Sequence, residues 1–152
     1  MRVGVISDTH GLLRPEAIEA LRGSELIVHA GDVGKADVLD ALRAIAPTVA
    51  VRGNVDTGDL AATLPETEVV EVGRTHLYVL HDLSQLDLDP RAAGFAAVIF
   101  GHSHRPAAET RDGVLYLNPG SAGPRRFSLP VAVARPLVEG ERLSHEIVEL
   151  RI

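Results

Sequence analysis

The sequence contains no cysteine and no tryptophan, and its only lysine is Lys35. Without cysteine the chain can form no disulfide, no thiolate metal site and no cysteine nucleophile, so nitrogen and oxygen atoms must hold any metal. Aromatic residues make up only 3% of the chain, so valine, leucine, isoleucine and alanine must fill the core. No apolar run approaches the roughly 18 residues that a membrane span needs.

The chain also lacks a dense basic segment. Its formal net charge is −6, whereas nucleic-acid binding without sequence preference depends on neutralising many phosphates with cations. We therefore expect no strong nucleic-acid binding and no membrane partner, although a small nucleotide remains a substrate candidate. Residues 2–6 are typical of a strand rather than of a signal peptide, so we expect a cytoplasmic protein.

The length of 152 residues fits a single domain, residues 1–152, with a core of its own. The first half alternates apolar strand-like runs with helical patterns. Strands are predicted at 2–6, 25–30 and 47–52, and helices at 15–22 and 36–45. Pro15 suits a first helical turn, and apolar residues recur at helical spacing in both helical segments. Strands that alternate with helices predict a parallel sheet.

The second half is predicted to form a second, largely antiparallel sheet, because turn signals separate its apolar runs at short intervals. Asp112-Gly113 is a strong hairpin signal between two of these runs. The predicted strands span residues 67–72, 75–81, 97–100, 106–111, 114–117, 130–135 and 143–150. Together the two halves predict an α/β (α+β) fold, a two-sheet β-sandwich flanked by helices.

Five short polar motifs each follow a predicted strand. They are Ser7-Asp8-Thr9-His10-Gly11, Gly31-Asp32, Gly53-Asn54, His81-Asp82 and Gly101-His102-Ser103-His104. In open α/β sheets, ligands bind beyond the carboxyl ends of the strands, where loops converge, so these motifs can meet at one place. Asp8 and His10 are expected to face the same side, as residues i and i+2 do in extended backbone. The same holds for His102 and His104.

The donors in these motifs are imidazole nitrogens with carboxylate and amide oxygens, which suit manganese, iron, cobalt, nickel or zinc. They are too many for one tetrahedral ion and fit two ions that share a bridging carboxylate. The donor residues are Asp8, His10, Asp32, Asn54, His81, His102 and His104. Two ions about 3.5–4 Å apart stabilise both oxygens of an in-line displacement and lower the pKa of a bound water. The expected nucleophile is a hydroxide that bridges the ions, so no protein nucleophile is needed.

In their order along the chain, these motifs resemble the signature of the calcineurin-like metallophosphoesterase superfamily, above all its small single-domain bacterial and archaeal phosphodiesterases. The resemblance covers residues 8–104 and extends to about residue 126 through Asn118-Pro119-Gly120-Ser121. It implies a four-layer fold and two divalent ions, with manganese preferred. It also implies that one ion binds to Asp8, His10 and His104 and the other to Asn54, His81 and His102, with Asp32 bridging. Catalytic roles are implied for Asp32, Asn54 and His102, and a phosphate contact for Asn54.

Two residues depart from the pattern of that superfamily. Val55 stands where many members have a histidine that is thought to protonate the leaving group. Valine cannot carry a proton, so we expect a preference for leaving groups of low pKa, such as phenols. Asp82 stands where the small branch usually has glycine, so we expect a change in the loop that carries His81 and therefore in the affinity for the second metal.

Other polar residues have simpler explanations beside the functional ones. His29 lies within a predicted strand and is expected to be a hydrogen-bonded interior residue or a partner of a ligand. The stretch 118–121 is either a turn or part of the lining of the site. Arg125 and Arg126 either bind phosphate oxygens or are solvated at the surface.

The leading prediction is a metal-dependent hydrolase of phosphodiester bonds in small substrates, nucleotide derivatives among them. Phosphomonoesters, including nucleotides, are the alternative substrates. A different class of function is a protein-interaction scaffold, as in the retromer subunit that resembles these enzymes but has lost part of its metal-binding residues. All seven donor positions carry competent ligands here, which favours catalysis. The sequence leaves open whether the protein forms a homo-oligomer.

Overall fold

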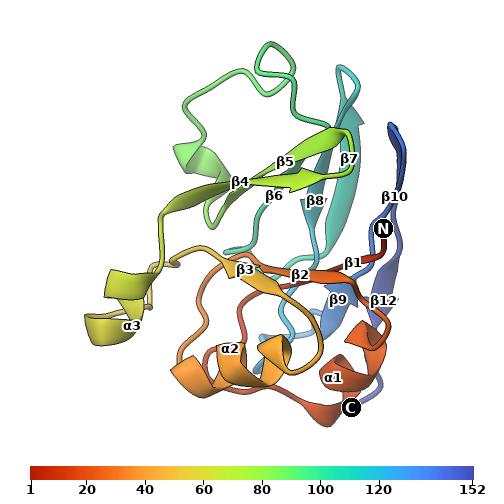
Figure 1. The fold of residues 1–152 in the computed structure, drawn as a ribbon. Coiled ribbons are helices and arrows are strands. Elements are labelled where there is room, and N and C mark those ends of the chain that lie inside the picture. The colour runs from red at the N-terminus through yellow and green to blue at the C-terminus, as the bar shows by residue number, and fades with distance from the viewer.

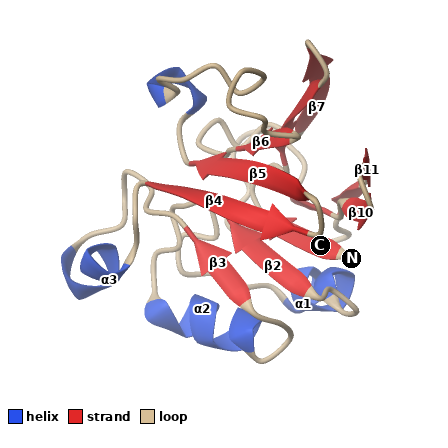
Figure 2. Ribbon diagram, turned by 45° about the horizontal axis from the view of Figure 1, so that its top comes forward, coloured by secondary structure: helices blue, strands red, loops and turns tan.

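Two five-stranded sheets face each other across the core of the computed structural model, which describes residues 1–152 (Figures 1 and 2). The first sheet runs β12 (Ile147–Glu149), β9 (Ala132–Ala134), β1 (Val3–Ile6), β2 (Leu26–His29) and β3 (Thr48–Ala50). The second runs β4 (Thr67–Val72), β5 (Thr75–Leu80), β6 (Ala97–Ile99), β8 (Val114–Asn118) and β7 (Ala107–Arg111). A separate hairpin consists of β10 (Leu137–Glu139) and β11 (Arg142–Ser144).

The first sheet confirms the parallel arrangement predicted for the first half of the chain. Strands β1, β2 and β3 pair in parallel, and helices α1 (Pro15–Leu21) and α2 (Ala36–Arg43) cover the outer face of this sheet (Figure 1). Leu21 and Leu42 from these helices are fully buried in the same cluster as Ile6 and Ile27 of the sheet. None of the helices combines the length and apolar character needed to cross a membrane.

The second sheet is mixed, so the prediction of a largely antiparallel sheet was only partly right. Strands β4–β5 and β7–β8 pair antiparallel, but β5–β6 and β6–β8 pair in parallel. Tight turns join only the antiparallel pairs, and a longer crossover is needed wherever a strand returns in the same direction. The segment between β5 and β6 supplies such a crossover. At Asp112-Gly113 both φ angles are positive, as the predicted two-residue hairpin requires.

Several short elements were not predicted. Helix α3 (Gly58–Thr63), the 3₁₀ helix η1 (Leu83–Gln85) and strand β10 lie in segments without a clear hydrophobic period. The predicted strand 143–150 is divided into β11 and β12, and the latter joins the first sheet together with β9. The C-terminal segment therefore returns to the sheet in which the chain began.

The crossover between β5 and β6 covers the outer face of the second sheet. Tyr78 and Leu80 of β5 are buried in a small cluster under Leu83, Leu86 and other residues of this segment. The structure confirms the two-sheet fold flanked by helices, with this segment and its one 3₁₀ turn forming the fourth layer. Because both faces of β5 are covered, it alternates between two apolar environments rather than between core and solvent.

The core between the sheets provides a test of the fold. Val79 is fully buried in this core, whereas Val69 on the neighbouring strand is 50% exposed. Val79→Ala is expected to lower the free energy of unfolding by about 2 kcal/mol, because two buried methyl groups are lost and a cavity remains. The matched variant Val69→Ala is expected to change it by less than about 0.5 kcal/mol. Urea unfolding measures both, and equal effects would contradict this account of the core.

Candidate metal centre

The five predicted motifs lie together at one end of the two sheets. The Asp8 N–H donates to the Gly31 carbonyl at 3.0 Å, which joins the loops after β1 and β2. The Gly101 N–H donates to the His81 carbonyl at 2.9 Å, which joins the loops after β5 and β6. A hydrogen bond between the sheets, from the His102 N–H to Asp8 Oδ2 at 3.1 Å, connects the two groups of loops. Residues more than 90 positions apart in the chain are thus neighbours.

Two buried carboxylates occupy the middle of this region, and each has one oxygen held by the protein. Asp8 Oδ2 accepts hydrogen bonds from Ser7 Oγ at 2.7 Å and from the His102 N–H at 3.1 Å. Asp32 Oδ1 accepts from the Val55 N–H at 2.9 Å. The remaining oxygens, Asp8 Oδ1 and Asp32 Oδ2, are the ones that approach the histidines described next.

His10 and His104 lie on one side of the carboxylates. His104 Nε2 is 3.3 Å from Asp8 Oδ1, and His10 Nε2 is 3.8 Å from the same oxygen. The two Nε2 atoms are 3.3 Å apart. His10 Nε2 is also 3.7 Å from Asp32 Oδ2. The ligand atoms of Asp8, His10 and His104 all lie within 4.8 Å of one another, close enough to hold one ion.

His81 lies on the other side and is oriented by the backbone. Its Nδ1 is 2.7 Å from the Ala30 carbonyl and must donate to it, so in the neutral imidazole the lone pair is on Nε2. That atom is 3.1 Å from Asp32 Oδ2 and 3.8 Å from Asp8 Oδ1. Such a backbone hydrogen bond commonly fixes a metal-binding histidine. Asp8, Asp32 and His81 form a second group of atoms within 4.8 Å.

The polar atoms of this region fit a divalent cation. Asp8 Oδ1 and His81 Nε2 are buried and have no hydrogen-bond partner. Buried polar groups are nearly always hydrogen-bonded, and a lone pair that faces carboxylate oxygens is repelled unless a proton or a cation lies between them. Imidazole and carboxylate donors are the ligands that first-row divalent metals accept.

Asn54 and His102 line the open side of the centre. His102 is 48% exposed, and its Nδ1 is 3.2 Å from Asn54 Oδ1. The rings of His102 and His81 meet edge-on, with centroids 5.3 Å apart. His102 Nε2 lies 3.9 Å from Asp82 Oδ2, so the residue that departs from the family pattern is next to a predicted ligand.

The backbone conformation of the predicted donors differs from what we expected. The Asp8/His10 and His102/His104 pairs are not extended, so the argument from residues i and i+2 was wrong. Instead, five of the seven donor residues have positive φ: Asp8 (55°), His10 (47°), Asp32 (56°), His102 (73°) and His104 (63°). Only Asp112 and Phe127 share this conformation among the other non-glycine residues. Such strain is tolerated where surrounding contacts enforce it, and it concentrates at functional sites.

Two of the predicted glycines allow the loops to approach closely. A Cβ at Gly101 would overlap Ser7 Oγ and lie 2.6 Å from Asp8 Oδ2. A Cβ at Gly53 would overlap the side chain and backbone nitrogen of Asp32. These glycines therefore place the loop that follows each of them directly against a carboxylate.

The charges of Asp32 and His81 depend on each other. Burial disfavours the Asp32 carboxylate, but the His81 imidazole and the Val55 N–H outweigh burial and lower the pKa of Asp32 from 3.8 to about 2. Burial also disfavours a charged His81, but the Asp32 and Asp8 carboxylates raise the pKa of His81 above its usual value of 6.5. The two carboxylates thus favour a positive charge beside them, either a proton on His81 or a bound cation.

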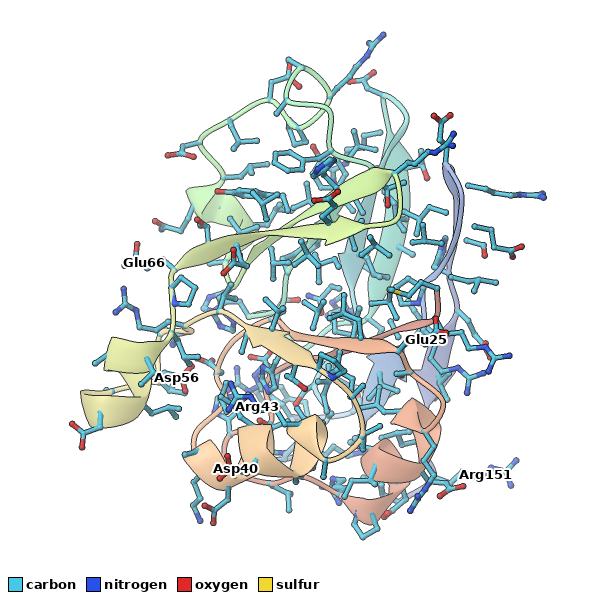
Figure 3. All side chains as sticks on the ribbon, in the orientation of Figure 1. Glu25, Asp40, Arg43, Asp56, Glu66 and Arg151 are labelled. Atoms are coloured by element: carbon cyan, nitrogen blue, oxygen red, sulfur yellow. The ribbon has the colours of Figure 1, made fainter.

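Sequence reasoning missed the role of Asp56, which ties two of the loops together. Its carboxylate accepts from the N–H groups of Val33 at 3.2 Å, Gly34 at 2.9 Å and Gly53 at 2.9 Å. Asp56 is buried and lies just before α3 (Figure 3). An aspartate in a glycine-rich loop often bonds nearby backbone N–H groups, and that was the one available signal.

Residues 118–121 form hydrogen bonds with the loops that carry the predicted donors. The Asn118 amide donates to the Gly101 carbonyl and to Ser103 Oγ, both at 3.1 Å. Ser121 Oγ donates to the Asp8 carbonyl at 3.0 Å. The stretch is therefore more than a turn. Arg125 and Arg126 are exposed and form no ion pair, so their contact with substrate stays a prediction.

The sequence matches a family model along most of its length. The model of the calcineurin-like phosphoesterase superfamily domain covers residues 1–139. The chain belongs to this superfamily. The predicted resemblance is confirmed, and membership of the superfamily supports metal-dependent hydrolysis of a phosphoester.

Known members of the superfamily resemble the chain in sequence and in structure. A protein of Methanothermobacter thermautotrophicus named "Probable metallophosphoesterase" is 39% identical over 160 residues, which cover 97% of this chain and 92% of that protein. The solved structure of Vacuolar Protein Sorting 29 from Cryptosporidium parvum has a TM-score of 0.85 at 21% identity, covering 99% of this chain and 91% of the other. An archaeal phosphodiesterase has a TM-score of 0.79 at 24% identity, covering 97% and 100%. These two structures bear on the fold alone.

His29 confirms the expectation of a hydrogen-bonded interior residue. Its Nδ1 accepts from the Gly31 N–H at 3.1 Å, so Nε2 must carry the proton that it donates to Thr9 Oγ1 at 3.0 Å. Thr9 Oγ1 in turn donates to the Val33 carbonyl at 2.8 Å. Burial lowers the pKa of His29 from 6.5 to about 4, although the Asp8 and Asp56 carboxylates oppose this shift.

This buried neutral histidine predicts a pH dependence of stability. Between pH 6.5 and about 4 the unfolded chain binds a proton at His29 and the folded chain does not. The free energy of unfolding is therefore expected to fall by roughly 3 kcal/mol as the pH drops through this range. The His29→Gln variant has no titrating group at this position. It should be less stable at pH 7, and its free energy of unfolding should lack this decrease between pH 6.5 and about 4. Urea unfolding at several pH values measures it, and parallel curves for the two proteins would contradict it.

Proposed function

We propose that this member of the superfamily hydrolyses phosphodiester bonds of small substrates, nucleotide derivatives among them, at a centre of two divalent ions. The observation that carries the proposal is the convergence of two buried carboxylates with His10, His81 and His104, where Asp8 Oδ1 and His81 Nε2 have no hydrogen-bond partner. The phosphomonoesterase alternative uses the same residues.

The distances support a ligand assignment that is part of this proposal. Asp8, His10 and His104 would hold one ion. His81 would hold the other with Asn54 and His102, whose side chains lie together on the open side. Asp32 would bridge the ions, because its Oδ2 approaches both His10 and His81, at 3.7 and 3.1 Å. Manganese is our first choice, since the donors are oxygens and imidazoles without a thiolate; iron, nickel, cobalt and zinc accept the same set.

The side chains of this chain would position the substrate and orient the ligands. Bound divalent ions supply Lewis acidity and lower the pKa of a coordinated water. The Asn54 amide lies at the open side, where it can donate to a phosphate oxygen, and His102 beside it would stabilise the same group. The acidic residues Asp82, Asp87 and Glu66 nearby disfavour the second negative charge of a monoester, which supports a diester substrate.

Removal of the bridging carboxylate tests this centre. Chelated protein is expected to be inactive on an aryl phosphodiester and to regain turnover with Mn²⁺. Asp32→Asn should lower kcat by at least about 100-fold, because a direct ligand matters more than the outer partners whose loss costs 10–100-fold. The surface variant Asp112→Asn, at a hairpin turn that tolerates asparagine, is the control.

Thermal unfolding gives a second measurement in the same experiment. Mn²⁺ is expected to raise the melting temperature of the wild type, since an ion that binds only the folded state stabilises it. The increase is expected to be smaller for Asp32→Asn. Wild-type turnover in Asp32→Asn would refute the assigned role. A protein that binds metal but hydrolyses neither diester nor monoester would instead be a scaffold.

The presence of valine at position 55 leads to a separate prediction about which leaving groups the protein prefers. Its side chain is 43% exposed beside Asn54 and cannot donate a proton. A general acid typically contributes 10²–10⁴-fold to rate, so alkyl phosphodiesters are expected to react at least about 100-fold more slowly than aryl ones. Val55→His should narrow this gap by about tenfold or more, with little change for the aryl ester. Equal wild-type rates on alkyl and aryl esters would contradict the prediction.

A further inference from the structure

A large cavity opens beside the proposed centre. Its volume is about 950 Å³. It lies between the segment that carries α3, the facing ends of β4 and β5, and the 3₁₀ helix η1. Most of its lining is polar and includes Arg52, Thr67, Tyr78, Asp82, Gln85 and Asp87.

The cavity is continuous with the site of chemistry. Asn54 and His81 line it as well. His81 is only 5% exposed, and its Nε2 has no hydrogen-bond partner. A group that occupies the cavity therefore lies next to the atoms that are proposed to hold the reacting phosphate.

The charges of the cavity do not balance. Arg52, its only arginine, pairs with Glu66 at 2.8 Å across the segment of α3 (Glu66 is labelled in Figure 3). The Asp56 carboxylate is taken up by three backbone N–H groups. Asp82 and Asp87 pair with no lysine or arginine, and only Asp82 has a histidine nearby, with its Oδ2 3.9 Å from His102 Nε2.

These two carboxylates differ in how they are held. Asp82 Oδ1 accepts from the N–H and the Oγ of Ser84, at 3.0 and 2.8 Å, and its Oδ2 lies 3.9 Å from His102 Nε2 without a hydrogen bond. Asp87 forms no ion pair and is exposed at the rim. An occupant therefore meets one carboxylate that is held by hydrogen bonds and one that is solvent-exposed.

Tyr78 is a second feature of the lining that can favour a cation. Tyr78 is 7% exposed, lines the cavity, and is held by the ring of Phe95 at a centroid distance of 5.1 Å. Aromatic rings attract ammonium groups, and quaternary ammonium ligands are recognised in this way. Carboxylates around a partly desolvated cavity strengthen the attraction.

We propose that this cavity binds the ammonium group of a phosphodiester of an amino alcohol, of which choline and ethanolamine esters are the simplest. The inference rests on the proposed function, because it names the substrate class of the same centre. The phosphate lies at the metal ligands, and the positive head group extends past His81 toward Asp82, Asp87 and Tyr78. A neutral polyol or nucleoside could donate hydrogen bonds to these carboxylates but would not neutralise their charge.

A pair of isosteric substrates tests the charge preference. With Mn²⁺ present, kcat/KM is measured for p-nitrophenyl phosphocholine and for p-nitrophenyl 3,3-dimethylbutyl phosphate, whose neutral tert-butyl group has the shape of the trimethylammonium group. The choline ester is expected to react about tenfold faster, a ratio that falls with ionic strength. Asp87→Asn should reduce the ratio, and Asp82→Asn with Asp87→Asn should bring it close to one. Asp112→Asn, which does not line the cavity, should keep it.

A binding measurement separates this inference from the proposed function. Choline chloride added to wild-type protein should shift the backbone amide NMR signals of Tyr78, Gln85 and Asp87, and 3,3-dimethylbutan-1-ol should not. The double variant should lose the shifts. Hydrolysis of both esters with a ratio near one overturns the cavity assignment and leaves the phosphodiesterase intact. If neither ester reacts, the proposed function fails. The choline titration then tests the cavity assignment alone, and the absence of NMR shifts would overturn that assignment as well.

Discussion

Two negative charges buried side by side are the constraint on which the structure depends. Asp8 and Asp32 belong to one group of atoms within 4.8 Å, and neither side chain is more than 4% exposed. Like charges at such a distance repel strongly away from water. Backbone N–H groups and Ser7 hold one oxygen of each carboxylate and fix its direction, but they leave the facing oxygens to be balanced. The histidines and the cation for which they are arranged supply that balance, and the loops, glycines and strained residues keep them in place.

The order of the motifs was sufficient to predict which residues meet, because each follows a strand whose carboxyl end faces the same edge. Asp8, Asp32 and His81 were predicted in this way and lie together. The backbone geometry could not be predicted, since left-handed conformations at Asp8 or His104 are enforced by tertiary contacts that sequence periodicity does not contain. The role of Asp56 was missed for a similar reason: its three N–H partners come from two different loops. Strand direction in the second sheet depends on crossovers whose path is set by packing.

The fold by itself does not distinguish an enzyme from a scaffold. The backbone superposes well on a vacuolar sorting protein and on a phosphodiesterase, at similarly low identity, and one architecture often serves unrelated functions. An enzyme and a scaffold differ in their chemistry. The differences lie in which metal donors line the end of the sandwich and in which side chains line the neighbouring cavity. In this chain all predicted donors are in reach of the two carboxylates or of each other. Val55 and the side chain of Asp82 are both more exposed than the carboxylates Asp8 and Asp32.

The division of the donors between the sheets has a consequence for assembly. Asp8, His10, Asp32 and Asn54 follow strands of the first sheet, whereas His81, His102 and His104 follow strands of the second. Neither sheet contains a complete coordination sphere. Under the proposed ligand assignment, tight metal binding would therefore require that both sheets have docked, and a partly folded form with separate sheets would bind an ion less tightly.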